Sequence, residues 1–390
     1  MAVCLPPLAL YVHLPWCVQK CPYCDFNSHG LREGALPETA YTEALLADLR
    51  WEAEALQTGR PLVSVFFGGG TPSLFSADRI GAVLEAADRT WGLAEDCEIT
   101  LEANPGTADA VHFAGYRAAG VNRLSLGVQS FDDAQLQRLG RIHDGAAARR
   151  AFALARQAGF DNINLDLMFA LPEQSIAAAA TDLEAAIALG PEHLSYYHLT
   201  LEPNTAFAAA PPPLPDEDTA ADMLDAGGHL LQAAGYGGYE TSAWARPGRR
   251  CHHNRVYWSF GDYIGIGAGA HGKYSARSGD GGLSIERRVR WRHPRHYLSA
   301  AGGAEVLQSC QAITPQARPF EFAMNALRLH DGFDWDTLAA HAGLRREDLA
   351  GVLETAQERG LLSVDETGVR PTALGRAHLN TLLQLFLEPA

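Results

Sequence analysis

The chain has 390 residues, of which 47% are hydrophobic, and carries a formal net charge of −15. This length and composition suffice for one large domain plus a smaller one, and the negative charge argues against broad binding to nucleic acid or to an anionic membrane. No apolar run reaches the roughly 18 residues that a membrane span needs, and the N-terminus lacks the basic start of a signal peptide. Seven cysteines is an odd number in a chain without secretory features, so we expect a reducing cytoplasm rather than a disulfide framework.

Short β-type runs alternate with helical patterns through the first half of the chain. The expected strands, in chain order, cover residues 8–15, 62–70, 98–105, 122–130, 162–172 and 193–203. The expected helices cover residues 38–56, 76–91, 109–120, a stretch ending near 158, and 175–189. Strict strand–helix alternation implies an α/β fold with a parallel sheet and helices outside it. Six units rather than eight predict a partial (β/α)6 barrel, open on one side, with its chemistry at the carboxyl ends of the strands.

The composition changes after the predicted barrel. A proline-rich turn at 208–219 precedes a further helix, and residues 236–300 crowd glycine, aromatic residues, histidine and arginine together. From residue 311 onward the pattern predicts short helices and a small hairpin, a winged-helix-like α+β module. That module holds 7 Lys and Arg against 11 Asp and Glu, a net −4, which favours packing or partner contact over DNA reading. We therefore expect three domains, namely a barrel with the cofactor site at 1–215, a barrel extension at 216–310 and the C-terminal module at 311–390.

Three cysteines, Cys17, Cys21 and Cys24, follow the first expected strand with C-x₃-C-x₂-C spacing. A tetrahedral zinc site usually takes four protein ligands, and His13 and His29 could complete such a site. An iron–sulfur cube also takes four ligands, so three cysteines would leave one iron open to another molecule. A substrate or cofactor could chelate that iron and take an electron from the cluster directly.

Placed directly after the first strand of a βα series, this cysteine motif resembles that of the radical S-adenosylmethionine (SAM) superfamily. The resemblance implies a [4Fe-4S] cluster whose fourth iron binds the amino and carboxylate groups of SAM. One-electron reduction then cleaves SAM to a 5′-deoxyadenosyl radical. In cofactor chemistry of this kind the protein supplies positioning, electronic tuning and exclusion of side reactions.

The resemblance extends beyond the cysteines to "FFGGGTPS", "ITLEANPGT", "RLSLGVQSF", "LGRIHD" and "NLDLMFALPEQ". These segments are similar to the subgroup that contains oxygen-independent coproporphyrinogen III dehydrogenase and its HemW-type relatives. By that match the glycine-rich loop would hold the methionine end of SAM, and Tyr11 would contact the adenine region. Each of these residues could instead be an ordinary turn, capping or strand-end residue. The residues that the resemblance assigns to SAM are Tyr11, Phe26, Gly69, Gly70, Thr71, Glu102, Gln129, Arg141 and Asp166.

Within this subgroup, Phe26 decides between two functions. The dehydrogenase pattern has a fourth cysteine where this chain has Phe26, and it carries a longer N-terminal arm. Both differences favour the HemW group, whose members are regarded as heme chaperones that pass heme to acceptor proteins. We therefore expect a heme chaperone without coproporphyrinogen dehydrogenase activity. The alternative is an oxygen-independent coproporphyrinogen III dehydrogenase of heme biosynthesis.

The stretch "ARPGRRCHHNRVYW", residues 245–258, is the richest candidate for a heme site. His252 and His253 are possible axial ligands, as is Cys251, because heme iron accepts imidazole or thiolate. Nearby arginines could pair with the propionates, and the Tyr-Trp pair could stack on the macrocycle. The same histidines could simply form hydrogen bonds, and the aromatic pair could be core. His271, after a glycine-rich strand end, is a less favoured candidate.

The resemblance implies heme, a heme-acceptor protein and an electron donor such as flavodoxin or ferredoxin as partners. It leaves open whether the chain is a monomer or a dimer. A third reading, a structural zinc protein or acidic adaptor, leaves the glycine loop and the polar strand ends unexplained.

Overall fold

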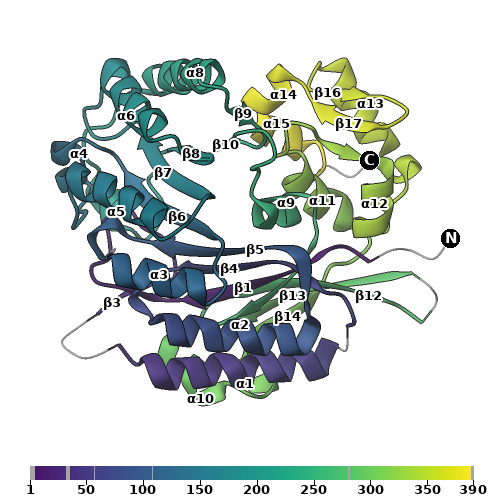
Figure 1. Cartoon of the computed structure of the whole chain (residues 1–390). Helices are drawn as coiled ribbons and strands as arrows, with labels where there is room; N and C mark the ends of the chain where they lie inside the picture. Colours follow the sequence, from purple (N-terminus) through teal and green to yellow (C-terminus); the bar gives the residue numbers. More distant parts are fainter. Residues whose placement is uncertain (1–4, 32–35, 57, 108, 280–281, 388–390) are drawn as a thin grey trace.

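The structure is a computed structural model that describes residues 5–31, 36–56, 58–107, 109–279 and 282–387. Its centre is one continuous open sheet with strand order β14-β13-β12-β11-β1-β4-β5-β6-β7-β8-β10-β9 (Figure 1). The strands from β1 to β8 in this order run parallel, each paired to the next. These strands are β1 (Leu8–Leu14), β4 (Leu62–Gly69), β5 (Leu93–Ala103), β6 (Arg123–Gln129), β7 (Ile163–Phe169) and β8 (His193–His198).

Helices connect these strands and cover the sheet, with α1, α2 and α3 lying side by side along one flank (Figure 1). Helix α2 buries Ile80, Val83, Leu84 and Ala87, the i, i+3, i+4, i+7 spacing of an apolar helix face. The helices are α1 (Glu38–Leu56), α2 (Ala77–Trp91), α3 (Ala110–Ala118), α4 (Asp133–Arg138), α5 (Gly145–Gln157), α6 (Ile176–Leu189), α7 (Ala206–Ala209), α8 (Glu217–Ala233) and α10 (Pro294–Ala300). The expected α/β fold of partial-barrel type is therefore confirmed.

Residues 236–312 add strands at both edges of the sheet, and none of these strands is among those expected from the sequence. Strand β11 runs parallel to β1, and β12, β13 and β14 follow it in antiparallel order. All five residues of β11 are buried, so it lacks the alternation of apolar and polar residues that marks a half-exposed strand. The added strands are β9 (Gly237–Gly238), β10 (Ala243–Ala245), β11 (Asp262–Ile266), β12 (His271–Arg277), β13 (Leu283–Arg290) and β14 (Leu307–Ala312).

The C-terminal segment forms a small α+β module, as the sequence predicted, and its apolar core also includes Phe260, Leu283 and Ile285 of the sheet extension. Its strand order is β15-β17-β16, and Phe322 on its first helix packs edge-on against Phe260, which follows helix α9 (His252–Trp258). The module consists of α11 (Arg318–Ala326), β15 (Phe333–Asp334), α12 (Trp335–Ala342), α13 (Ala350–Glu358), β16 (Leu362–Val364), β17 (Gly368–Pro371), α14 (Ala373–Ala377) and α15 (Leu379–Gln384). The three domain boundaries proposed from the sequence stay a prediction.

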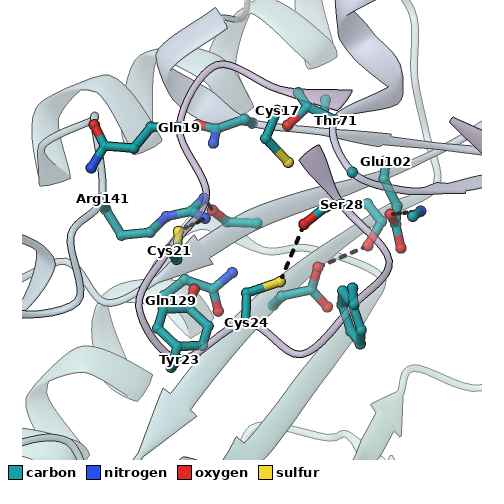
Figure 2. Close-up of a pocket in the computed structure, with 18 of the residues that line it drawn as sticks. Cys17, Gln19, Cys21, Tyr23, Cys24, Ser28, Thr71, Glu102, Gln129 and Arg141 are labelled. Atoms are coloured by element: carbon teal, nitrogen blue, oxygen red, sulfur yellow. Dashed lines mark hydrogen bonds between the residues drawn. The ribbon is translucent and has the colours of Figure 1, made fainter. Parts of the chain in front are cut away.

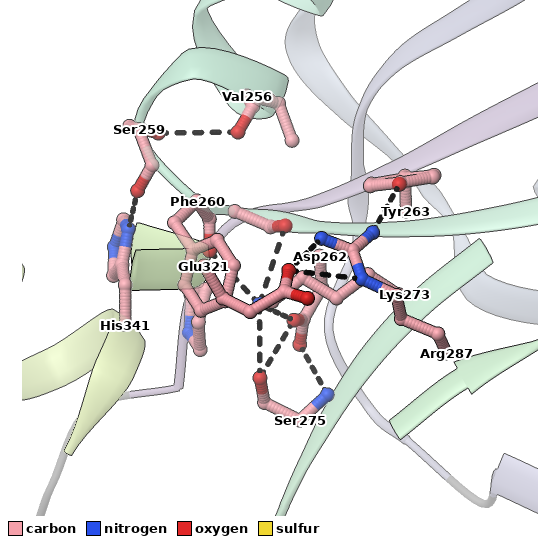
Figure 3. A network of polar contacts seen from close by, with 12 residues as sticks. Val256, Ser259, Phe260, Asp262, Tyr263, Lys273, Ser275, Arg287, Glu321 and His341 are labelled. Atoms are coloured by element: carbon pink, nitrogen blue, oxygen red, sulfur yellow. Dashed lines mark hydrogen bonds and ion pairs between the residues drawn. The ribbon is translucent and has the colours of Figure 1, made fainter. Parts of the chain in front are cut away.

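A buried polar network lies where the module meets the sheet (Figure 3). The ammonium of Lys273, almost fully buried, donates to Asp262 at 2.9 Å and to the carbonyl of Phe260 at 2.9 Å. Arg60 and Ser275 donate to the same carboxylate. Buried charges of this kind persist only when paired and hydrogen-bonded, so this network fixes the start of β11 against β12.

Among the described residues, no helix combines the length and the apolar character that crossing a bilayer requires.

We expect Lys273→Met to lower the free energy of unfolding by about 3 kcal/mol, because it leaves part of a buried carboxylate uncompensated. Arg89→Met, which removes an exposed pair with Glu85, is the matched control and should leave stability unchanged. Urea titration monitored by circular dichroism measures the free energy of unfolding of both variants. Equal shifts in the two would show that the Lys273 pair contributes nothing beyond a surface contact.

Candidate functional site

The cysteine loop leaves the sheet at the carboxyl end of β1. It is closed at its base by a two-residue parallel ribbon, in which β2 (Trp16–Cys17) pairs with β3 (His29–Gly30). The amide of His29 donates to the carbonyl of Pro15 at 2.7 Å, and that of Leu31 donates to the carbonyl of Cys17 at 2.8 Å. Because both ends of the loop are tied together, its three thiols are confined to one short segment above the strand.

The glycine-rich loop at the end of β4 is bound directly to this segment. The amide of Gly70 donates to the carbonyl of Leu14 at 2.9 Å, and the amide of Thr71 donates to that of Trp16 at 2.7 Å. A Cβ at Gly70 would lie 2.5 Å from the Trp16 carbonyl oxygen, and one at Gly69, whose φ is +111°, would lie 2.4 Å from the His13 ring. Glycine is therefore required at both positions, because the backbone at Gly70 lies against the Trp16 backbone and the backbone at Gly69 lies against the His13 ring.

One cavity collects the residues that the sequence assigned to the cluster and to SAM, apart from Tyr11 (Figure 2). We call it the cysteine cavity. It lies over the carboxyl ends of β4, β5, β6 and β7, the rim that carries chemistry in βα barrels. Its lining residues are Cys17, Gln19, Cys21, Tyr23, Cys24, Phe26, Ser28, Gly69, Gly70, Thr71, Glu102, Ala103, Asn104, Ser125, Gly127, Gln129, Arg141, Asp166 and Tyr197.

Two carboxyl groups lie in the cysteine cavity. Burial, and secondarily the charge of Asp166, raises the pKa of Glu102 to about 8, although the amide of Gly69 donates to it at 3.2 Å. Burial also raises the pKa of Asp166, against hydrogen bonds from Asn164 and Ser125 that favour its ionised form. Perturbed carboxyl groups in a cleft are typical of ligand sites, and a cationic ligand group near Glu102 would favour its ionised form.

Gln129 and Arg141 are held in defined positions at the rim. Gln129 has a φ of +70° beside an irregularity in the β6–β7 register, and its Oε1 accepts from the hydroxyl of Tyr197 at 2.6 Å. Arg141, between α4 and α5, donates to the carbonyl of Gly127 at 2.6 Å and to Cys21 Sγ at 3.5 Å. Its buried Nε has no hydrogen-bond partner among the described residues. A strained residue and an unpartnered donor at one rim both indicate a place for a ligand.

The cysteines suit an iron–sulfur cluster better than a zinc ion or a nucleophile. Burial raises the pKa of Cys17 and Cys24, whereas reactive cysteines have a lowered pKa; a bound metal would deprotonate these thiols. His13, a candidate fourth zinc ligand, already uses both ring nitrogens, with the hydroxyl of Tyr11 at 2.9 Å and the carbonyl of Asn27 at 2.9 Å.

In the described part of the chain, no three His, Cys, Asp or Glu side chains lie close enough to bind a single metal ion. A cubane cluster does not require such convergence, because each cysteine binds a different iron. The donor set of three thiols with one adjacent arginine therefore fits the cluster.

A second cavity of about 630 Å³ adjoins the first and shares Phe26, Gly69 and Glu102 with it. We call it the tyrosine cavity. Tyr11, assigned to the adenine region from the sequence, lies here and not in the cysteine cavity. Partial burial, followed by the charges of Arg287 and Arg292, lowers the pKa of His271. The residues that line the tyrosine cavity are Tyr11, His13, Phe26, Asn27, Gly69, Glu102, Tyr257, Tyr263, Gly269, His271, Val289, Arg292, Gln308 and Ser309.

His252 and His253, the sequence candidates for heme ligation, line neither cavity. They open helix α9, where Glu98 accepts from the backbone amides of both residues at 2.9 and 3.2 Å. The His253 ring is buried, stacks on Phe66 at 4.9 Å and bonds to Ser64 Oγ at 3.0 Å. His252 lines a separate cleft with acidic residues at the start of β5. The heme role of these two residues stays a prediction.

Several cavity residues were missed from the sequence. Tyr197 is one of two adjacent tyrosines on β8, and its partner Tyr196 faces the core; the alternation of a strand was the available signal. Tyr23 lies inside the cysteine motif and could have been found by its position. Nothing in the sequence marked Gln19 as a cavity residue, because an exposed polar residue in a loop can have many different roles.

Comparison with known proteins places the chain among characterised relatives. A family model described as the radical SAM superfamily matches residues 11–186, and one described as the HemN C-terminal domain matches residues 313–378. The chain is 48% identical to heme chaperone HemW of Escherichia coli over 98% of this chain and 99% of that protein. It is 45% identical to heme chaperone HemW of Haemophilus influenzae over 98% of each.

Among solved structures, coproporphyrinogen III oxidase (HemN) from Escherichia coli, titled a radical SAM enzyme, has a TM-score of 0.79 at 24% identity. It covers 98% of this chain and 90% of its own. At that identity the likeness shows the fold alone, and it supports the mixed α/β architecture with a C-terminal α+β module.

We expect Gly70→Ala to lower stability by about 1–3 kcal/mol and to reduce the iron that the chain retains after anaerobic reconstitution, since the new Cβ would displace the Trp16 backbone beside Cys17. Gly59→Ala, where a Cβ would meet nothing within 4 Å, is the matched control. Iron and sulfide analysis with thermal unfolding checks this. Full iron content in Gly70→Ala would contradict the coupling of the two loops.

Proposed function

The chain belongs to the HemW family of the radical SAM superfamily, and from this premise we propose that it binds heme and passes it to acceptor proteins. Its three cysteines would hold a [4Fe-4S] cluster with SAM at the open iron. The observation that carries this proposal is the end-to-end match to HemW proteins. Phe26 supports it, because this side chain is 63% exposed at the cavity rim and offers no fourth thiol.

The proposed cluster ligands are Cys17, Cys21 and Cys24. When bound, the cluster supplies single electrons and SAM supplies a cleavable sulfonium. Around them, side chains of this protein would orient SAM and balance its charged groups. Arg141, whose Nε lacks a partner, would pair with the SAM carboxylate by a charge-assisted hydrogen bond. Glu102 would accept from the SAM amino group.

The remaining proposed SAM contacts lie along the same rim. Asp166 would accept from ribose hydroxyls, and Gln129 can both donate and accept. Gly69, Gly70 and Thr71 present backbone atoms beside Cys17, where the methionine end of SAM would lie. Phe26 would contact SAM from the border of the two cavities, and Tyr11 would contact it from the tyrosine cavity.

The partners follow from the proposal and stay predictions. A heme-acceptor protein would receive the heme, and a flavodoxin or ferredoxin would reduce the cluster. We likewise propose that the chain is located in the cytoplasm, as a monomer or a dimer.

The deciding experiment is a paired assay on the anaerobically reconstituted full chain. We expect hemin titration to give stoichiometric binding, and incubation with coproporphyrinogen III, SAM and a reductant to give no vinyl product. Cys17→Ala should lose the cluster and keep hemin binding, because none of the three motif cysteines is a proposed heme ligand. Rapid turnover of coproporphyrinogen would instead establish the dehydrogenase alternative.

We expect SAM binding to release a proton from Glu102 below about pH 8, in addition to any proton that the SAM amino group loses when it binds iron. Glu102 is protonated below its pKa of about 8, and the positive sulfonium of SAM near it favours the carboxylate. Calorimetry of SAM binding at pH 7 in buffers of different ionisation enthalpy measures the number of protons released. Glu102→Gln should release fewer protons than the wild type at pH 7, and an equal number in that variant would assign the whole release to another group.

A further inference from the structure

The side-chain amide of Gln129, a proposed SAM contact, can either donate or accept a hydrogen bond. We propose that Tyr197 is a positioning residue for SAM: its hydroxyl fixes this amide so that Nε2, and not Oε1, faces the ligand beside Arg141. The two side chains then present N–H donors together to an oxygen acceptor of SAM. This inference rests on the proposed function and assigns a role to a further residue of the same site.

Tyr197 holds the carbonyl end of the amide. Its hydroxyl donates to Gln129 Oε1 at 2.6 Å, and among the described residues no other side chain or backbone group forms a hydrogen bond with this hydroxyl. A partly buried hydroxyl needs an acceptor for its proton, and the carbonyl oxygen of the amide can serve as one whereas the NH₂ group cannot. The contact therefore selects one of the two orientations of the amide.

The opposite end of the amide faces the cysteine cavity. Gln129 is 6% exposed and lines that cavity, and in the described part of the chain no hydrogen bond engages its Nε2. The backbone is fixed here in an unusual conformation, because a φ of +70° lies in a region that residues other than glycine rarely adopt. An unpartnered donor on a strained, buried residue indicates a place for a ligand.

Gln129 and Arg141 place their donors on the same side of Gly127. A Cβ added at Gly127 would lie 3.2 Å from Gln129 Nε2 and 3.4 Å from Arg141 Nη2, and both side chains line the cysteine cavity (Figure 2). Arg141 donates from Nη1 to Cys21 and from Nη2 to the Gly127 carbonyl, and its buried Nε has no partner among the described residues. An oxygen atom of a ligand placed at these donors would be bound from both side chains.

Without the tyrosine hydroxyl, the opposite orientation of the amide would be favoured. Gln129 Oε1 would then turn toward the guanidinium of Arg141, because a partial negative charge beside a cation is attractive and two N–H groups side by side are not. Arg141 would gain a partner within the protein, and the ligand would lose the Nε2 donor. Tyr197 therefore acts on SAM through Gln129, without a contact of its own.

The test is a double-mutant cycle on SAM binding to the anaerobically reconstituted full chain. Equilibrium dialysis gives the dissociation constants, and the electron paramagnetic resonance spectrum of the reduced cluster reports SAM at the open iron. Tyr197→Phe should weaken SAM binding by about two- to tenfold, the loss of one oriented hydrogen bond. In the Gln129→Ala background the same change should have no further effect, because Tyr197 acts through the amide.

Tyr196→Phe is the matched control, because it removes a hydroxyl from the core-facing side of the same strand. It should bind SAM with wild-type affinity. Iron and sulfide content reports whether each variant is folded around its cluster.

A second variant tests the direction of the amide with Tyr197 intact. Gln129→Glu keeps the shape and the acceptor for the hydroxyl but replaces Nε2 by an oxygen, so it should bind SAM no more tightly than Gln129→Ala. Wild-type affinity in Gln129→Glu, or equal losses for Tyr197→Phe with and without Gln129, would overturn the role of Tyr197 and leave SAM binding intact. Absence of SAM binding by the wild type would overturn the proposed SAM site as well.

Discussion

The contact between the glycine loop and the cysteine loop is the constraint on which the rest of the site depends. Gly69 and Gly70 lie so close to His13 and Trp16 that no side chain fits between them. Two backbone hydrogen bonds then hold the carboxyl ends of β1 and β4 next to each other at the same edge of the sheet. Because the sheet is parallel, the ends of β5, β6 and β7 follow at the same edge, and their polar side chains converge beneath the thiols.

This arrangement produces two adjoining cavities with different chemistry. The cysteine cavity has thiols, buried carboxyl groups and an arginine with an unpartnered donor, which suits a charged ligand on a metal cluster. The tyrosine cavity has aromatic walls and the exposed imidazole of His271. Phe26, Gly69 and Glu102 belong to both, so occupants of the two cavities would touch the same side chains. Phe26 thus has a structural meaning beyond the lack of a fourth thiol, as part of the wall that the two cavities share.

The C-terminal module forms polar contacts with elements that carry tyrosine-cavity residues (Figure 3). Tyr263 accepts from Arg287, which is paired with Glu321 on α11 of the module. On α12, His341 Nδ1 bonds to the carbonyl of Ser259 at 2.5 Å, just after α9. Both contacts hold elements whose tyrosines line the cavity. The acidic module is therefore an integral wall support in this structure, which agrees with a packing role.

The sequence by itself determined the alternating α/β fold, the C-terminal module and the group of cluster and SAM candidates, because hydrophobic periodicity and short motif spacings are local properties. The convergence of Glu102, Gln129 and Asp166 also followed, since strand ends of a parallel sheet share an edge. Arg141 reaches the same rim from the segment between α4 and α5. Only the tertiary structure decided the rest. It turned residues 262–277 into the largely buried strands β11 and β12 and enclosed the His253 ring against Phe66, because burial depends on residues distant in the chain. Tyr11 lines the tyrosine cavity because β1 pairs with β11 as well as with β4, and the pairing with β11 joins residues distant in the chain.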